Sequence, residues 1–213
     1  MHVEAVRRRG RPARARRGVA ALAGFAFAFA FAAAAALGSG SAQAQPKPET
    51  LAACAACHGP NGNAPVEQFP SIAGQPRVFL ENTLVLIREG LREVPAMQPV
   101  MAGMGDDEIV ALAKHFAAQP PVARPVAVQA AKAEAGKRAA AGLLCGTCHL
   151  ATFAGQNQVP RLAGQNEAYL LASMKQFRDN PGPGRDTIMS ATLRGVTDAD
   201  LANLAHHLAA FKP

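Results

Sequence analysis

The sequence of 213 residues contains no tryptophan, one tyrosine and only four cysteines. It also lacks any sustained alternation of polar residues with apolar β-branched ones, which argues against a protein built on β-sheets. Aromatic residues make up 5% of the chain, so a domain of about 80 residues would have a thin core of its own. We therefore predict an all-α protein with little aromatic material to fill its interior.

The chain has no basic excess outside its first 44 residues. The formal net charge is +7, but residues 1–44 hold seven arginines and one glutamate. The remaining residues carry 15 basic and 14 acidic side chains, a net charge of +1. This balance gives no support for binding to nucleic acids, and we predict no nucleic-acid partner.

Residues 1–44 have the organisation of a secretory signal peptide. Seven arginines between Arg7 and Arg17 are followed by 19 apolar residues, Val19 to Leu37, and by a small-x-small cleavage pattern at residues 42–44. We therefore predict export, with cleavage after Ala44. The alternative is a retained membrane anchor, because an apolar run of 19 residues is long enough to span a bilayer.

All the cysteines belong to two copies of the pattern Cys-x-x-Cys-His, at residues 54–58 and 145–149. This pattern is typical of covalent haem attachment, in which two thiols bond to the haem and the adjacent histidine ligates the iron. We therefore predict two haems c, and haem c is attached outside the cytoplasm, in agreement with export. The predicted attachment residues are Cys54, Cys57, Cys145 and Cys148, and the predicted iron ligands are His58 and His149.

Zinc binding and disulfide formation are the alternatives for these cysteines. The Cys pairs of such zinc sites are usually about 15 to 20 residues apart, whereas 87 residues separate Cys57 from Cys145. A thioredoxin-like redox pair is expected between a strand and a helix, but the residues before both patterns have a helical composition. The spacing therefore favours haem attachment.

The sequence from Cys54 to Gln119 recurs from Cys145 to Phe211. Residues 70–75 (Pro-Ser-Ile-Ala-Gly-Gln) match residues 160–165 (Pro-Arg-Leu-Ala-Gly-Gln), and apolar residues with helical spacing follow in both copies. The segment between the copies, residues 119–125, contains three prolines and predicts a short, stiff linker. The predicted domains are residues 45–122 and residues 123–213.

Each copy is expected to end in an amphipathic helix. In the second copy Thr197 and Asp200 form a start resembling a capping box, and in the first copy the helix is expected from about Asp106. The Ala- and Leu-rich residues from Glu134 to Cys145 are expected to form the helix that leads into the second Cys-x-x-Cys-His pattern.

Methionine is the expected second axial ligand of each iron, because its soft thioether favours Fe(II). Met97 and Met189 lie 39 and 40 residues after the two histidines and align with each other, in expected loops before the last helices. The alternative for any single methionine is core packing. That interpretation is preferred for the methionines that align with other apolar residues, Met101, Met104 and Met174.

Two prolines are candidates for orienting the histidines. Pro70 and Pro160 follow the histidines by 12 and 11 residues, and a proline carbonyl could accept a hydrogen bond from the histidine Nδ1–H. The alternative is a simple turn proline.

Several basic residues are weaker candidates. Arg92 and Arg185 precede the methionines and could reach a haem propionate, although a solvated surface charge is preferred. His115, His206 and His207 are interpreted as solvated helix residues and as reserve ligands should a methionine fail.

The twin Cys-x-x-Cys-His patterns, the Pro-x-x-Ala-Gly-Gln segments and the late methionines resemble the dihaem cytochrome c4 family over nearly all of residues 50–213. The resemblance implies two tandem class I cytochrome c domains, each a small helical fold around one covalently bound haem. It also implies that one haem is held by Cys54, Cys57, His58 and Met97, and the other by Cys145, Cys148, His149 and Met189. One departure is Leu150, where the first copy has Gly59 after the histidine.

The resemblance implies a periplasmic electron carrier without catalytic activity, which transfers single electrons between respiratory redox partners. The implied partners are a terminal oxidase, a quinol-oxidising complex or a dehydrogenase, and peripheral association with the membrane is left open. One alternative is a haem-bearing subunit of a periplasmic dehydrogenase complex. Another is a dihaem peroxidase, which would need a vacant or displaceable iron ligand.

Overall fold

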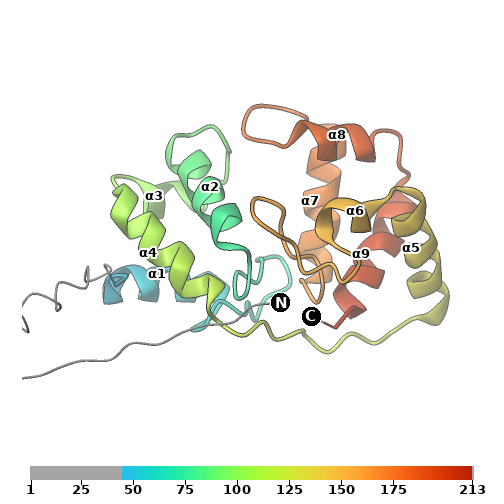
Figure 1. Cartoon of the computed structure of the whole chain (residues 1–213), viewed down its shortest axis with the longest axis horizontal. Helices are drawn as coiled ribbons and strands as arrows, with labels where there is room; N and C mark the ends of the chain where they lie inside the picture. The colour runs from blue at the N-terminus through green and yellow to red at the C-terminus, as the bar shows by residue number, and fades with distance from the viewer. Residues whose placement is uncertain (1–44, 213) are drawn as a thin grey trace, which may run out of the picture. The chain divides into compact units, whose positions relative to one another are not determined.

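A computed structural model of the chain describes residues 45–212. The signal peptide, the cleavage after Ala44 and the alternative anchor, all predicted from residues 1–44, lie outside this range. Within residues 45–212 the chain forms helices joined by loops and contains no strand, as predicted for an all-α protein (Figure 1). None of the described helices is long and apolar enough to cross a membrane.

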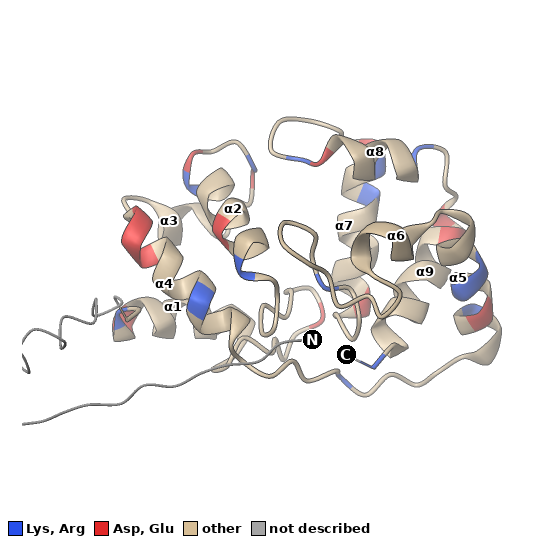
Figure 2. Ribbon diagram, in the orientation of Figure 1, with Lys and Arg blue, Asp and Glu red and all other residues tan. Residues whose placement is uncertain are grey.

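In the first half of the described chain, residues 45–122, the helices are α1 (Pro48–His58), α2 (Arg77–Arg88), α3 (Gln98–Met101) and α4 (Asp106–Ala117). Helix α2 packs against α4, where its Leu80 is buried with Leu112 and Phe116 and its Ile87 is buried with Ile109. Three acidic residues in the first turn of α4 (Figure 2) lie at the positive end of its helix dipole and stabilise that terminus.

In the second half, residues 123–212, the helices are α5 (Ala130–Gly142), α6 (Cys145–His149), α7 (Glu167–Asp179), α8 (Thr187–Leu193) and α9 (Asp198–Ala210). Helices α5 and α7 both pack against α9 (Figure 1). The crossing of α5 and α9 requires a glycine, because a Cβ on Gly136 would lie 2.1 Å from the carbonyl oxygen of Asn203. Helix α9 is capped as predicted, since the Thr197 hydroxyl accepts a hydrogen bond from the Asp200 N–H at 3.1 Å.

The prediction of a continuous helix from Glu134 to Cys145 is wrong at its C-terminal end. Helix α5 ends at Gly142, Leu144 adopts left-handed angles (φ 55°, ψ 32°), and a separate helix α6 begins at Cys145. The low helix propensity of glycine favours an end at Gly142. Leu144 is 70% exposed, so the break costs little apolar burial. In the first half α1 runs without interruption through the corresponding residues.

The described residues all lie within one compact unit, Gln43–Pro213. The proline-containing linker is fastened to the first half by Asn63, whose side chain donates to the Pro120 carbonyl at 3.1 Å and accepts from the Val122 N–H at 2.8 Å. The domain limits at residues 122 and 123 stay a prediction.

Candidate functional site

The two Cys-x-x-Cys-His patterns lie on helices in both halves. Cys54, Cys57 and His58 form the last turns of α1, whereas the second pattern makes up the whole of α6. None of the four cysteines forms a disulfide. Burial raises the pKa of the Cys54 and Cys145 thiols. In each helix the histidine directly follows the second cysteine, so the helical backbone fixes the position of the histidine relative to the two cysteines.

Each histidine is held by the carbonyl of a proline. The Nδ1 of His58 lies 2.8 Å from the Pro70 oxygen, and the Nδ1 of His149 lies 2.8 Å from the Pro160 oxygen. Because a carbonyl can only accept, Nδ1 carries the proton and the lone pair is on Nε2, the atom available to a metal. Burial also lowers the pKa of both histidines and favours the neutral form that binds iron. The hydrogen-bonding role predicted for the two prolines is therefore present in the structure.

Burial does not separate the predicted ligands from all the methionines assigned to packing, because Met104 is half-buried at the edge of the same core as Met97. Met101 is 1% exposed and Met174 is 8% exposed, and both belong to the cores. Met97 and Met189 are half-buried at the edges of these cores. The expectation that they lie in loops holds for Met97, which is in the turn directly before α3 and is its N-cap, and is wrong for Met189, which is within α8. Both short helices precede the last helix of their half.

The loop after the second histidine keeps the backbone conformation of the first without its glycine. Gly59 has φ 76° and ψ 161°, and Leu150 has φ 67° and ψ 158°. Three residues later the correspondence repeats, because Gly62 and Phe153 both have a positive φ and their carbonyls accept equivalent pairs of backbone hydrogen bonds. At these two positions the second half therefore differs in the residue and its strain but not in the backbone conformation.

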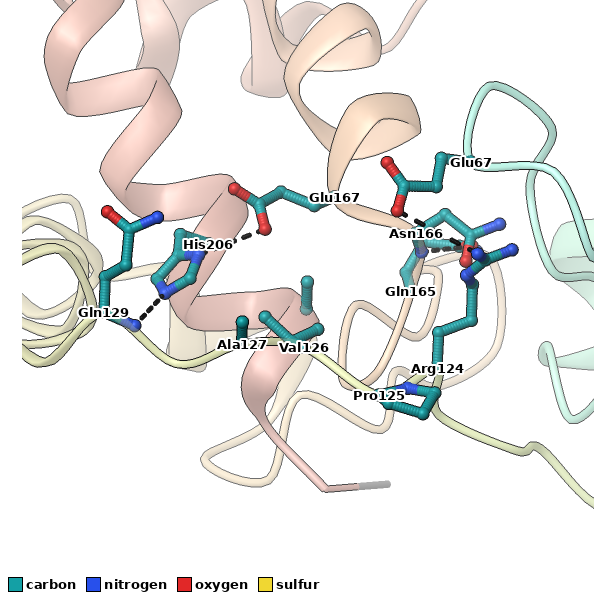
Figure 3. A pocket seen from close by; sticks show the side chains of 11 residues that line it. Glu67, Arg124, Pro125, Val126, Ala127, Gln129, Gln165, Asn166, Glu167 and His206 are labelled. Atoms are coloured by element: carbon teal, nitrogen blue, oxygen red, sulfur yellow. Dashed lines mark hydrogen bonds and ion pairs between the residues drawn. The ribbon is translucent and has the colours of Figure 1, made fainter.

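His206 is not the solvated residue that was predicted. It is 2% exposed, its Nε2 accepts the Gln129 N–H at 3.0 Å and its Nδ1 lies 3.1 Å from a Glu167 carboxylate oxygen (Figure 3). Accepting at Nε2 places the proton on Nδ1, so a neutral imidazole makes both bonds. The sequence prediction failed because neither partner lies on the same helix: His206 holds α9 to the residue before α5 and to the first turn of α7.

His206, Gln129 and Glu167 line a cavity of about 350 Å³ (Figure 3). Arg124 and Glu67 also line it. Arg124 and Glu67 lie 4.0 Å apart across it. The lining contains no cysteine and no methionine, so the cavity is separate from the residues that sequence analysis assigned to the haems.

The described residues fit an anionic prosthetic group such as haem. Arg161 Nε and Arg185 Nη1 are buried, and within residues 45–212 they have no hydrogen-bond partner. Arg161 is 4% exposed with no carboxylate bound to it, and burial lowers its pKa to about 10. A buried cation without a counter-charge is costly, and the propionates of a haem would supply that charge. Arg185 is half-buried over the Phe177 ring, contrary to the predicted surface position.

Sequence analysis missed Gln75 and Gln165, which are 4% and 3% exposed and make hydrogen bonds between the halves. The available signal was that the same amide residue ends the matched segments 70–75 and 160–165.

Comparison with known proteins agrees with the fold. Residues 133–212 match the family model described as "Cytochrome c", and residues 42–115 match "Cytochrome C oxidase, cbb3-type, subunit III". The chain is 30% identical to cytochrome c4 of Pseudomonas aeruginosa, over 74% of this chain and 83% of the relative. The chain belongs to the cytochrome c4 family. Membership confirms the predicted resemblance and the two tandem cytochrome c domains.

The crystal structure of reduced recombinant cytochrome c4 from Pseudomonas stutzeri superimposes on this chain with a TM-score of 0.71, at 26% sequence identity. The match covers 79% of this chain and all of that structure. A second relative, from Thiomonas intermedia, is named as an electron acceptor of thiosulfate dehydrogenase and is 30% identical over 75% of this chain and 78% of its own. As a member of the cytochrome c4 family the chain is a haem electron carrier with covalently bound haem c.

Proposed function

We propose that this protein is a periplasmic dihaem cytochrome that passes single electrons between respiratory redox partners. The observation that carries the proposal is the same arrangement in both halves, a Cys-x-x-Cys-His helix whose histidine donates to a proline carbonyl at 2.8 Å. The first haem is held by Cys54, Cys57, His58 and Met97. The second haem is held by Cys145, Cys148, His149 and Met189.

The residues support electron transfer more than catalysis. Haem iron supplies a reversible one-electron change between Fe(II) and Fe(III). A histidine fixed by Pro70 or Pro160 should move little when the iron changes between Fe(II) and Fe(III). A small change in geometry favours rapid electron transfer. Half-buried Met97 and Met189 would fill the second axial position, so a substrate such as peroxide would have to displace a ligand.

One candidate partner is a dehydrogenase that oxidises a sulfur compound. It is favoured by the relative from Thiomonas intermedia, which is named for accepting electrons from thiosulfate dehydrogenase. In this form of the proposal the protein works as the haem-bearing partner of that enzyme, and the dehydrogenase performs the catalysis. Reduction of the purified protein by a thiosulfate dehydrogenase, measured in the α band, would distinguish it from a carrier that accepts only from a quinol-oxidising complex.

The proposal is tested by measuring the haem content and the methionine ligation of the exported protein. A pyridine haemochrome assay should find two haems per chain, and one or none would refute the proposal. The ferric protein should show a weak far-red band from sulfur-to-iron charge transfer. The Met97→Ala and Met189→Ala variants should each lose about half of that band, because each removes one of two similar chromophores.

Matched controls separate ligation from packing. Met101→Leu and Met174→Leu replace buried methionines with residues of similar volume and should keep the whole band. Carbon monoxide should bind the reduced Met→Ala variants faster than the reduced wild type. Rapid binding to the wild type, or peroxide turnover by it, would favour the peroxidase alternative instead.

A further inference from the structure

The two halves are joined by a reciprocal pair of glutamine side chains. The Gln165 amide accepts the Ser71 N–H at 2.8 Å and donates to the Ser71 carbonyl at 2.8 Å. The Gln75 amide accepts the Arg161 N–H at 2.9 Å and donates to the Arg161 carbonyl at 3.0 Å. Both amide groups are oriented by these contacts, because a backbone N–H must face the amide oxygen and a carbonyl must face the amide nitrogen.

Each glutamine acts on the peptide group that holds a histidine of the other half. The carbonyl of Pro70 and the N–H of Ser71 belong to one peptide group. Its oxygen accepts the His58 Nδ1–H at 2.8 Å, and its N–H donates to Gln165 at 2.8 Å. Donation from one end of a peptide polarises it and makes the oxygen at the other end a stronger acceptor.

The second half has the equivalent chain of hydrogen bonds, in which a glutamine of the first half binds the peptide group that holds the second histidine. The peptide group between Pro160 and Arg161 accepts from His149 at 2.8 Å and donates to Gln75 at 2.9 Å. All four residues that contribute these peptide and amide groups, Ser71, Gln75, Arg161 and Gln165, are at most 4% exposed. Solvent therefore does not compete for these bonds, and in such surroundings hydrogen bonds polarise one another most strongly.

We propose that Gln165 and Gln75 are positioning residues that each tune the haem of the opposite half. A stronger bond at Nδ1 gives the histidine more imidazolate character and makes it a stronger donor to iron. A stronger donor stabilises Fe(III) and lowers the reduction potential. Gln165 thus lowers the potential of the haem on Cys54 and Cys57, and Gln75 lowers that of the haem on Cys145 and Cys148.

The proposal rests on the haem ligation given under Proposed function, and its signature is a crossed effect. In the Gln165→Met variant, which keeps the side-chain length but loses both hydrogen bonds to Ser71, the potential of the first haem should rise and that of the second should stay. Gln75→Met should do the opposite. Each variant is the control for the other, because both lose two hydrogen bonds between the halves, and simple loosening would move both haems alike. Gln165→Met also loses the bond from the Asn166 N–H at 2.9 Å, which lies within the second half and would act on the second haem rather than the first.

A redox titration of the haem-loaded protein measures the two potentials. The components are assigned in a Met97→His or a Met189→His background, where a second imidazole lowers the potential of one haem and separates it from the other. Gln119→Met is a further control, since this side chain donates to the His115 carbonyl and contacts neither peptide group. Both potentials should be unchanged in that variant.

A second readout does not depend on the potentials. In proton NMR spectra of the ferric protein, the His58 Nδ1–H should exchange with deuterium faster in Gln165→Met, while the His149 Nδ1–H should not. If Gln165→Met loses haem, Gln165→Glu keeps the accepting oxygen and should retain slow exchange of the His58 proton. Equal shifts of both haems, a shift in the mutated half, or no shift would overturn the proposal. A haemochrome result other than two haems would instead refute the proposed function.

Discussion

Leu150 should lower the stability of the protein through its backbone conformation. It follows the second histidine with φ 67° and ψ 158°, whereas the first half has a glycine at this position with nearly the same angles. This combination lies in a region that is almost restricted to glycine, and residues held in such regions cost about 1–3 kcal/mol. A glycine at position 150 should therefore stabilise the second half.

The backbone contribution is isolated by comparing Leu150→Gly with Leu150→Ala, because both remove the side chain beyond Cβ. The alanine variant keeps the strain. The glycine variant loses about 1–3 kcal/mol of strain but costs about 0.5–1 kcal/mol in additional backbone entropy. We therefore expect Leu150→Gly to be more stable than Leu150→Ala by about 1–2 kcal/mol.

Guanidinium denaturation of the haem-loaded variants, followed by circular dichroism, measures this difference. The control is Ala172→Gly, at an exposed position in the middle of α7, where glycine should be less stable than alanine by about 1 kcal/mol. The order of glycine and alanine should thus reverse between positions 172 and 150. A Leu150→Ala protein at least as stable as Leu150→Gly would refute the reasoning.

Three further predictions follow from single contacts. Gly136→Ala should destabilise the second half by about 1–3 kcal/mol in thermal denaturation, because its Cβ would lie 2.1 Å from the Asn203 oxygen; an unchanged melting temperature would contradict the close crossing of α5 and α9. His206→Leu leaves the Gln129 N–H unpaired and should lower the free energy of unfolding by about 1–3 kcal/mol. His115→Leu, at a half-buried position, should lower it clearly less in the same denaturation measurement. Hydrogen bonds from Lys175 and Arg178 hold the pKa of Asp198 below its usual range. Their contribution to the free energy of unfolding is therefore complete above about pH 4, the ordinary pKa of an aspartate. It is lost as the pH falls through the lowered pKa of Asp198. Asp198→Asn should therefore be less stable than wild type near neutral pH and equal to it in acid, and a constant difference in urea denaturation across this range would count against the ion pair.

The fold could be predicted because its signals are local. The capping of α9 depends on residues Thr197 and Asp200, and the apolar stripes of α4 and α9 depend on spacing within one helix. The break between α5 and α6 was missed because leucine has a good helix propensity, and only the backbone at Leu144 shows the left-handed turn. The helical position of Met189 was missed because α8 is too short to give a periodic pattern.

The candidate site could be predicted in part for the same reason. The Cys-x-x-Cys-His pattern and the prolines that accept from the histidines lie at fixed spacings within each copy. Contacts between the copies have no such spacing. Gln75 reaches Arg161 across 86 residues, and Gln165 reaches Ser71 across 94, so a repeat shows that the amides match but not what they bind.

The comparison of the two halves indicates where their haems should differ. Both halves share the histidine, the proline carbonyl and the opposing glutamine, so these bonds act equally on the two irons. Side chains that differ between the matched loops include Leu150 and Phe153, which replace glycines, and Arg161, which replaces Ser71. Of these, Arg161 brings a buried positive charge whose Nη2 donates to the Ala73 carbonyl of the first half at 2.9 Å. Because a nearby cation disfavours Fe(III), we expect any difference between the two reduction potentials to depend more on Arg161 than on the shape of the second loop.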